Sequence, residues 1–553
     1  MFESQLNPMQ RTEHVKALGR DEFDVLVIGG GITGVGTALD AASRGLKVAL
    51  VESQDLASGT SSRSSKLIHG GLRYLEQYNF KLVREALHER ELLVSQLAPH
   101  LVKPVGFLYP LHEKVKERTY IGAGLALYDA LRGFQRALPT HKHISQKKIA
   151  EIAPSLRTDL ITGAIKYFDA GVDDARHTFS VARTAVRHGA IVVTRMQCQE
   201  LIRDGKKVIG AKVRDLISGD EISVSSKVTV MCAGIWSDEL HKKFGIKPSY
   251  KVAMSKGAHI VLPGKAIKSD AGIILRTEIS VLFVIPWREQ WIVGTTDTPY
   301  KADRNNPTAT KEDIEYILSE ANRILEPKIS ASEIIGVYAG LRPLVANVKS
   351  STTTDLSREH VIDSAVPGFI SIAGGKYTTY RIMAKDVIDV AVKELKGNIP
   401  KSITHKLPAI GADGYFALMQ QIKQISGNSG LSEAVVTSLL NRYGSLINEV
   451  IELVDADNEL GEHLTGDLPY IKAEIVYAAS HEGALSIEDV ISRRTRIAFE
   501  SIDGGAEIIN VVADLIAPIL SWTDEMKSKS ISDYLNSLAR DRKSLEELLS
   551  TFS

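Results

Sequence analysis

The feature that most constrains this chain is a glycine-rich turn between two short apolar runs near its start. Residues 24–28 form a β-rich run, Asp-Val-Leu-Val-Ile, and Gly29-Gly30-Gly31-Ile32-Thr33-Gly34 follows directly. A helical pattern then ends near Arg44-Gly45, and a second β-rich run occupies residues 48–51. This order and spacing predict a βαβ unit of the kind that binds dinucleotides.

The glycines and a following acid have separate predicted roles. Gly29 permits a tight turn, Gly31 lets the backbone approach a pyrophosphate, and Gly34 lets the helix pack closely on the strand. Glu52 ends the second β-rich run, where a carboxylate can accept hydrogen bonds from ribose hydroxyls. Its presence favours an adenosine ribose without a 2′-phosphate, but FAD and NAD both fit the pattern.

The segment after Glu52 favours FAD. Residues 53–66 read SQDLASGTSSRSSK, which is rich in hydroxyls and small residues. Such a loop can wrap a long, extended dinucleotide and donate hydroxyl and N–H groups to its phosphates. The alternative is that the segment is a flexible linker. The position of the segment directly after the ribose-binding acid argues against a linker. The cofactor contacts expected here are Thr60, Ser61, Ser64, Ser65, Lys66 and Leu67.

Three cations lie beside glycine-rich turns. Arg73 follows Gly70-Gly71, Arg342 follows Gly340-Leu341, and Lys376 follows Gly374-Gly375 at the start of a helical pattern. Together they would offer a phosphate three positive charges, and the glycine pairs, Gly71 and Gly375 in particular, would let backbone approach a flat ligand. Three unrelated surface cations are the alternative, since sequence alone does not show that they converge.

A histidine and a strand end supply further candidates. His259, in Lys256-Gly257-Ala258-His259, begins a strand-like run and could act as a general base; a hydrogen-bonded core histidine is the alternative. Ala233 and Gly234 end another β-rich run in small residues suited to approach a cofactor. Cys232, beside them, is expected to pack rather than to act as a nucleophile.

Composition excludes several functional classes. The 67 Lys and Arg balance 67 Asp and Glu, so no excess charge favours nucleic-acid binding. Two cysteines are too few for a disulfide framework, an all-cysteine zinc site or a cysteine-ligated iron–sulfur cluster, and no other metal site is predicted. No apolar run reaches 18 residues, and the polar start lacks the apolar region of a signal peptide. We therefore expect a reduced, cytoplasmic protein.

The coarse pattern predicts three regions. Residues 1–20 are expected to be an N-terminal extension. Residues 21–400 carry the dinucleotide-binding unit interleaved with alternating strand-like runs that favour an antiparallel substrate domain. Residues 405–553 show only helical patterns, which predicts a helical C-terminal domain. The fold class is therefore α/β and α+β.

Residues 112–148 form a basic amphipathic stretch. They carry eight Lys or Arg against three acids, and an apolar stripe runs from Ile121 to Leu138 through Leu125 and Tyr128. Such a segment can lie in the interface of an anionic membrane. A helix that packs its stripe on the core is the alternative, and it is favoured about two to one.

These motifs together resemble the FAD-dependent glycerol-3-phosphate dehydrogenases over nearly the whole chain. The most specific piece is SSRSSKLIHGGLRYL at residues 61–75, supported by Lys256–His259, Gly340–Pro343 and Gly374–Arg381. His481-Glu482-Gly483-Ala484, with Asp489 and Arg493-Arg494-Thr495, resembles that family's C-terminal signature.

The resemblance implies a Rossmann-like FAD domain, an antiparallel substrate domain similar to glycine and D-amino-acid oxidases, and a helical cap. It implies oxidation of sn-glycerol 3-phosphate to dihydroxyacetone phosphate, with electrons passed from FAD to a membrane quinone. Arg73, Tyr74, Arg342, Lys376 and Thr378 would then surround the substrate, Arg73, Arg342 and Lys376 would assist catalysis, and His259 would remove the proton. Lys376 would also contact FAD. A peripheral position on the inner face of the cell membrane and a homodimer are compatible with it.

Rival functions share these motifs. A glycerol-3-phosphate oxidase, which uses O2 and releases hydrogen peroxide, would have the same substrate site. The short segment at residues 303–310 argues modestly against it, because oxidases of this family tend to carry an insertion in the substrate domain. A sensor that binds FAD without turnover is the second rival, but it would not need the three cations. An amino-acid oxidase is a weaker third.

Overall fold

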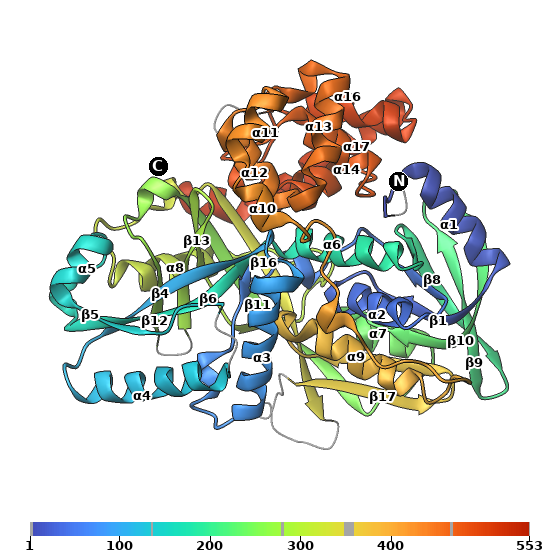
Figure 1. The fold of residues 1–553 in the computed structure, drawn as a ribbon, viewed down its shortest axis with the longest axis horizontal. Helices are drawn as coiled ribbons and strands as arrows, with labels where there is room; N and C mark the ends of the chain where they lie inside the picture. The colour runs from blue at the N-terminus through green and yellow to red at the C-terminus, as the bar shows by residue number, and fades with distance from the viewer. Residues whose placement is uncertain (1–3, 134–136, 278–280, 348–358, 465–467, 552–553) are drawn as a thin grey trace.

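The computed structural model describes residues 4–133, 137–277, 281–347, 359–464 and 468–551. Within them, two large sheets lie side by side and a group of helices covers one edge of both (Figure 1). Strand β1 (Glu22–Ile28) and helix α2 (Ile32–Ser43), which flank the glycine-rich turn, lie in the right half of the view. Most of the second sheet lies in the left half, and its strands β11 (Tyr250–Pro263) and β16 (Gly336–Asn347) lie near the centre. This arrangement agrees with the predicted combination of α/β and α+β parts.

The first sheet has the order β17-β18-β10-β1-β2-β7. Its centre is parallel: β1 pairs with β2 and β10, β10 with β18, and β2 with β7. The hairpin β8–β9 and strand β17 add antiparallel pairs. The strands are β1 Glu22–Ile28, β2 Val48–Val51, β7 Ile191–Val193, β8 Met196–Asp204, β9 Lys207–Asp215, β10 Glu221–Met231, β17 His360–Val366 and β18 Phe369–Gly374.

One face of this sheet packs on three helices, and the other face packs on the β8–β9 hairpin and the N-terminal helix. Helices α2 (Ile32–Ser43), α6 (Asp174–Arg187) and α9 (Tyr380–Ala391) form an apolar core with strand residues such as Val27 and Leu50. The opposite face buries Phe23 and Leu26 with residues of β8, β9 and helix α1 (Pro8–Arg20). Both faces are covered, which explains why β1 and β2 are continuous apolar runs.

The second sheet has the order β15-β11-β14-β13-β12-β4-β6-β3, with β16 added on β11 and β5 on β6. All its pairs are antiparallel except β12 with β4, so the predicted antiparallel sheet is confirmed with one exception. The strands are β3 Leu67–Ile68, β4 Val102–Leu111, β5 Lys142–Ser145, β6 Gly163–Val172, β11 Tyr250–Pro263, β12 Gly272–Arg276, β13 Val281–Trp287, β14 Gln290–Gly294, β15 Thr298–Pro299 and β16 Gly336–Asn347.

Helices cover both faces of this second sheet as well. Helices α5 (Gln146–Ile152) and α8 (Lys311–Asn322) share an apolar core with one face. Helices α3 (Phe80–Leu92) and α4 (Lys116–Leu131) pack on the other, where Ile121, Leu125 and Tyr128 of α4 are buried. The apolar stripe of residues 112–148 is therefore a core stripe as far as Leu131; Phe134 and Arg136 lie outside the described residues.

The described residues after 405 form helices, as predicted. They are α10 Tyr415–Met419, α11 Ile422–Ser429, α12 Glu433–Tyr443, α13 Ile447–Ala456, α14 Lys472–Ser480, α15 Ile497–Glu500, α16 Ile509–Leu520 and α17 Asp524–Leu549. Before α15 the chain forms a wide helical turn at Asp489–Arg494. Here Arg494 pairs with Asp55, in the loop after β2, and Arg496 pairs with Asp174 at the start of α6. The boundaries 21–400 and 405–553 stay predictions.

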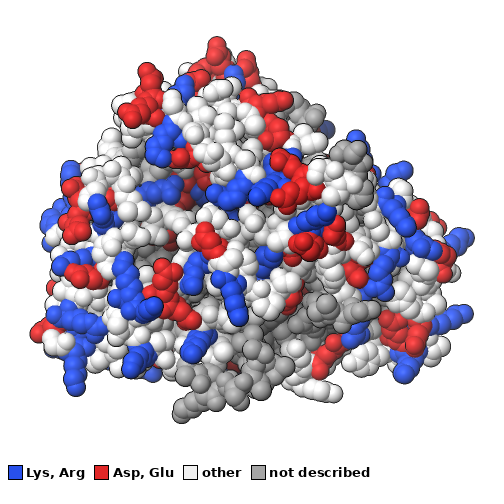
Figure 2. Space-filling view, turned by 180° about the vertical axis from the view of Figure 1, so that it is seen from behind, with Lys and Arg blue, Asp and Glu red and all other residues white. Residues whose placement is uncertain are grey.

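Charges of both signs mix on the molecular surface. Figure 2 shows Lys and Arg interspersed with Asp and Glu over the face opposite to that of Figure 1, without a large area of one sign. That distribution gives this face no basic stripe of the kind that tracks a nucleic-acid backbone.

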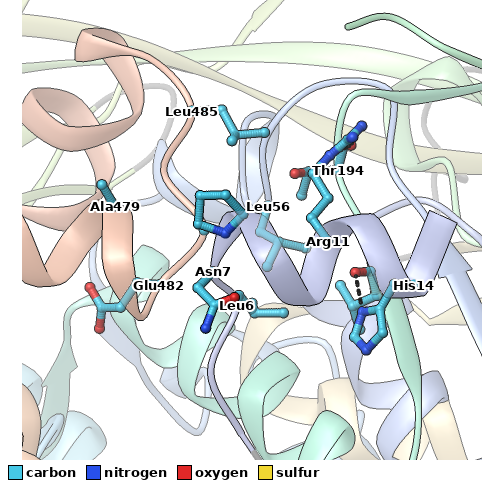
Figure 3. Close-up of a pocket in the computed structure, with 12 residues that line it drawn as sticks. Leu6, Asn7, Arg11, His14, Leu56, Thr194, Ala479, Glu482 and Leu485 are labelled. Carbon is cyan, nitrogen blue, oxygen red and sulfur yellow. Dashed lines mark hydrogen bonds between the residues drawn. The ribbon is translucent and has the colours of Figure 1, made fainter. Parts of the chain in front are cut away.

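The N-terminal segment joins the first sheet to the helical group. The side chain of Asn7 caps α1 by accepting from the backbone N–H of Gln10, and the N–H of Leu6 donates to the carbonyl of His481 at 2.9 Å. Arg11, His14 and Glu482 line a cavity at this junction (Figure 3). Its volume of about 20 Å³ has room for a water molecule rather than a substrate.

Candidate active site

The glycine-rich turn has the geometry that its sequence predicts. Gly29 has a φ of +114°, and a Cβ there would lie 2.6 Å from the carbonyl oxygen of Cys232. A Cβ on Gly34 would overlap the carbonyl oxygen of Gly29. Helix α2 begins at Ile32, so the turn leads directly into the N-terminus of this helix. The first and third glycines therefore allow strand, turn and helix to lie in direct backbone contact.

Hydrogen bonds tie the following loop to this turn. Ser61 Oγ accepts from the N–H of Ile32 at 3.0 Å, and Thr60 Oγ1 donates to the carbonyl of Leu341 at 2.7 Å. The carboxylate of Glu52 accepts from the N–H groups of Gly30 (2.6 Å) and Gln54 (2.7 Å). Burial raises the pKa of Glu52, and these donors oppose that shift. The loop is an ordered wall, not a linker.

A cavity of about 390 Å³ runs along this wall. Its lining includes the turn, the end of β2, the loop 58–64, the end of β10 and the segment after β18. The size lies in the range of cofactor sites, and a backbone-lined cavity at the carboxyl ends of parallel strands fits an extended dinucleotide. The predicted cofactor residues that line it are Gly29, Gly31, Glu52, Thr60, Ser61, Ser64, Ala233, Gly234, Gly375 and Lys376.

The other predicted cofactor residues lie beside the cavity. Gly34 is buried in the helix–strand contact, and Leu67 is buried in β3. Ser65 Oγ lies 2.8 Å from Nε2 of His259. Lys66 points its Nζ to Asp174, 2.9 Å from Oδ1, and burial lowers its pKa to about 8. Gly71 lies against the ring of Tyr74 and near Lys376 Nζ.

Several cavity-lining side chains carried no signal in the sequence analysis. They come from β8, the turn after β10, α7 (Ser237–Lys243) and the loop between β15 and α8, and are Met196, Gln197, Trp236, Lys243 and Asn305. Trp236 lies at the first turn after Gly234, where an aromatic next to a small-residue strand end could have been noticed. The others come from distant segments, and only the fold brings them to the cavity.

Lys376, Tyr74 and Thr378 form one cluster at the end of the cavity. Lys376 Nζ lies 3.5 Å from the centre of the Tyr74 ring, a cation–π contact. Thr378 Oγ1 accepts from the N–H of His69 at 3.2 Å, which joins the segment after β18 to the glycine pair before Tyr74. Arg73 belongs to the turn Leu72–Tyr74, and its side chain lies outside the described residues.

Arg342 lies on β16 opposite Ser255 of β11. Its guanidinium donates to Asp297 Oδ1 (3.1 Å) and to Thr295 Oγ1 (2.9 Å). The next residue, Pro343, lines the same cavity as Lys376. Adjacent side chains of a strand point to opposite faces, so Arg342 lies behind the wall that Pro343 forms, and Asp297 balances its charge.

His259 lies on the same sheet face as Arg342. Arg342 pairs with Ser255 of β11, and the side chains of Ser255 and His259, four residues apart in this strand, point the same way. It stacks on Tyr338 with ring centres 4.7 Å apart and is 2% exposed. Burial, together with the charges of Arg342 and Lys66, holds its pKa well below the usual range. The imidazole is therefore neutral at working pH, and the same shift makes it a weaker base than a free imidazole. Cys232 is buried and its pKa is raised to about 12, so it packs as expected.

Arginines of the helical domain pair with acids that lie behind the 62–66 segment. Asp174, at the start of α6, accepts from Ser64 Oγ (2.6 Å) and pairs with both Lys66 and Arg496. Asp55, near the start of the 53–66 loop, pairs with Arg493 (2.6 Å) and Arg494 (2.6 Å). The sequence analysis grouped Arg493-Arg494 with a family signature but did not foresee their contact with the cofactor loop.

Comparison with known proteins gives two family-model matches. The FAD dependent oxidoreductase model matches residues 24–381, and the model for the C-terminal domain of alpha-glycerophosphate oxidase matches residues 402–527. A protein of Mycobacterium tuberculosis named glycerol-3-phosphate dehydrogenase 2 is 49% identical over 530 residues, which is 96% of this chain and 90% of that protein. The chain belongs to the FAD-dependent glycerol-3-phosphate dehydrogenase family.

Other relatives agree with this family. Human mitochondrial glycerol-3-phosphate dehydrogenase is 36% identical, covering 96% of this chain and 74% of that protein. The structure of the Bacillus halodurans glycerol-3-phosphate dehydrogenase, complexed with FAD, superposes with a TM-score of 0.80 at 28% identity and covers 98% of both chains. Glycine oxidase from Geobacillus kaustophilus shares the fold, with a TM-score of 0.53 at 17% identity over 68% of this chain and 96% of its own. FAD is the cofactor of the family, and the predicted fold class and cofactor are confirmed.

Among the described residues, no helix has both the length and the apolarity to cross a bilayer. Helix α4 lies at the edge of the molecule away from the helical domain (Figure 1) and exposes Tyr120 (61%) and Leu127 (40%). The outer face of α4 thus carries apolar side chains that the core does not use.

Proposed function

We propose that this protein oxidises sn-glycerol 3-phosphate to dihydroxyacetone phosphate and passes the electrons to a membrane quinone. The observation that carries the proposal is the cluster of Lys376, Tyr74 and Thr378, whose Lys376 lines the wall of a dinucleotide cavity. The names of its relatives at 49% and 36% identity support the same substrate. When bound, FAD supplies a two-electron acceptor for the hydride on C2 of the substrate.

The chain's own residues would bind the phosphate and control the proton. Lys376 and Arg342, with Arg73, provide positive charge for the phosphate, and an arginine can bind it through two N–H groups. Tyr74 and Thr378 would orient the carbon chain. His259 is neutral, as general-base action requires, and would take the proton of the C2 hydroxyl. Its Nε2 already contacts Ser65 Oγ, which offers a route for that proton.

Reduction of the purified holoenzyme by its substrate tests the proposal. We expect anaerobic sn-glycerol 3-phosphate to bleach the visible flavin band, and a quinone analogue to restore it faster than air does. A flavoprotein that this substrate does not bleach would refute the substrate assignment. Fast reoxidation by air with release of peroxide would instead identify a glycerol-3-phosphate oxidase, to which the name of the C-terminal family model also points.

Replacement of Arg342 tests the phosphate site. We expect Arg342→Ala to raise KM for sn-glycerol 3-phosphate roughly 10- to 100-fold, because a charge-assisted hydrogen bond to the phosphate is lost. The matched control is Arg323→Ala, since Arg323 is exposed and pairs with Glu320 far from the cavity. Steady-state kinetics normalised to bound FAD provide the measurement. An unchanged KM in Arg342→Ala would remove this residue from the site.

The outer face of α4 is the proposed peripheral contact with the membrane. Tyr120 and Leu127 are apolar and exposed, and Lys114 and Lys116 lie at the start of the helix, a combination suited to the interface of anionic lipid. Sedimentation with anionic vesicles tests this. Tyr120→Ser combined with Leu127→Ser should lower the bound fraction, and equal binding of variant and wild type would exclude α4.

A further inference from the structure

A chain of buried polar groups lies behind the loop that carries the glycine pair Gly70-Gly71. The hydroxyl of Tyr128, on α4, accepts from the N–H of Gly70 at 2.8 Å and donates to Asp169 Oδ1 at 2.7 Å. The same carboxylate oxygen accepts from Arg90 at 2.6 Å and lies 3.3 Å from the N–H of Gly70. Side chains of α4 and β6 therefore meet at one backbone amide, and Arg90 of α3 holds the β6 carboxylate.

Burial fixes the direction of these hydrogen bonds. Tyr128 is 1% exposed, Asp169 is 3% exposed and Arg90 is fully buried. Burial beside Asp169 raises the pKa of Tyr128 well above its usual range, so the hydroxyl keeps its proton. It can then donate only to the carboxylate, which leaves its lone pair for Gly70. A phenylalanine in this place would leave the Gly70 amide with the longer contact alone.

The loop ahead of this amide builds the substrate cluster. Thr378 holds the neighbouring residue His69 from the cavity side, at 3.2 Å. Gly71 has a φ of +77° and starts the turn that ends at Tyr74, whose N–H donates to the Gly71 carbonyl at 2.8 Å. The Tyr74 ring then meets Lys376. Because Tyr74 is hydrogen-bonded to Gly71, the residue after Gly70, we expect a shift of Gly70 to reach this ring.

We propose that Tyr128 is a positioning residue for substrate binding: held by Asp169 and Arg90, it sets the place of Gly70 and through it the contact between Tyr74 and Lys376. This inference rests on the proposed function only for the identity of the substrate. Tyr128 does not line the cavity, so its effect is indirect. It acts from the inner side of α4, the helix whose outer face is exposed.

The test compares two tyrosine-to-phenylalanine variants of the holoenzyme. Tyr128→Phe removes the hydroxyl that contacts Gly70. Tyr167→Phe is the matched control, because Tyr167 is also buried and its ring lies 6.1 Å from that of Tyr128, while its hydroxyl bonds to no described residue. We expect KM for sn-glycerol 3-phosphate to rise about tenfold in Tyr128→Phe, as for loss of a buried hydrogen-bond partner, with kcat per bound FAD within about twofold of wild type. Tyr167→Phe should leave both constants unchanged.

Amide hydrogen exchange gives a second measurement that does not depend on the substrate. Peptides covering residues 67–76 should exchange faster in Tyr128→Phe than in wild type, and at the wild-type rate in Tyr167→Phe. Equal KM and equal exchange in the two variants would overturn the inference. A wild-type enzyme that sn-glycerol 3-phosphate does not reduce would refute the proposed function, while the exchange result would still decide the role of Tyr128.

Discussion

The two contacts of the FAD-binding sheet differ in kind. Its inner face meets α2, α6 and α9 through side chains such as Val27, Leu50 and Val387, all buried and apolar. Its contact with the helical domain, which we call the seam, consists largely of buried ion pairs. The seam pairs are Asp55 with Arg493 and Arg494, Asp173 and Asp174 with Arg496, Arg176 with Glu482, and Arg195 with Asp489.

These two contacts respond differently to change. Apolar burial stabilises in proportion to area, about 25 cal/mol per Å², and tolerates swaps that keep volume. A buried ion pair adds little net stability because desolvation offsets the attraction, yet loss of one partner leaves a charge stranded. The apolar core therefore holds the sheet together, while the seam determines which surface of the helical domain meets it.

Removing one acid of the seam should have the largest effect. Asp55→Asn would leave Arg493 and Arg494 without their shared carboxylate, at a cost of about 3–5 kcal/mol in the free energy of unfolding. FAD occupancy should fall too, because Asp55 lies in the cofactor loop. Urea unfolding of the holoenzyme measures the change. The exposed pair of Lys529 and Asp533 serves as control, and Asp533→Asn should cost less than about 1 kcal/mol. Equal effects of the two variants would contradict a special role for the seam.

A substitution that crowds the apolar contact between the sheet and its helices should have an intermediate effect on the free energy of unfolding. Gly34→Ala would push a methyl group onto the Gly29 carbonyl, and overpacking of this kind costs about 1–3 kcal/mol. Gly124 lies inside α4, and nothing lies within 4 Å of the place that a Cβ would take there. Gly124→Ala should therefore raise the free energy of unfolding by about 0.5–1 kcal/mol. Thermal unfolding of both variants shows whether the signs differ. A stabilised Gly34→Ala would mean that the turn is looser than the structure indicates.

A cation at the domain boundary, to which the described residues offer no carboxylate, provides the smallest effect per pH unit. Lys103 donates to the Pro99 carbonyl at 2.7 Å and to the Tyr415 hydroxyl, and burial lowers its pKa to about 7 from 10.5. Between these values the unfolded chain binds more protons, so stability rises with pH, by at most about 1.4 kcal/mol per unit. Urea unfolding from pH 7 to pH 9 should show this slope in wild type and a smaller one in Lys103→Met. Identical slopes would show that Lys103 keeps its ordinary pKa.

Local patterns made the cofactor half of the site predictable. The turn at Gly29–Gly34, the carboxylate of Glu52 and the hydroxyl-rich loop lie within one stretch of chain, where spacing maps directly onto geometry. The helical and strand patterns were equally local, and β1, α2 and β2 lie where they were expected. Each of these features depends on neighbours in sequence more than on the rest of the fold.

Long-range pairing made the rest unpredictable. Arg493 and Asp55 are 438 positions apart, and nothing near either residue indicates the other. Tyr128 read as one more apolar residue in a helical stripe, although its hydroxyl reaches the backbone of Gly70. Lys66 looked like a phosphate contact from its position in the loop, and only the fold reveals that Asp174 takes its charge. Sequence indicates the residue types at a site; which atoms meet depends on distant segments.

The seam also has a consequence for how the protein comes into being. Asp55 leaves the ribosome early, whereas Arg493 and Arg494 follow only after almost all of the two sheets has been made. Until then Asp55 lacks both of the arginines that pair with it, whereas Asp173 and Asp174 can already pair with Arg288 and Lys66. Tight retention of FAD is thus a late event in the life of each chain, and a copy cut short before Arg493 would carry the whole glycine-rich turn and still hold its cofactor poorly.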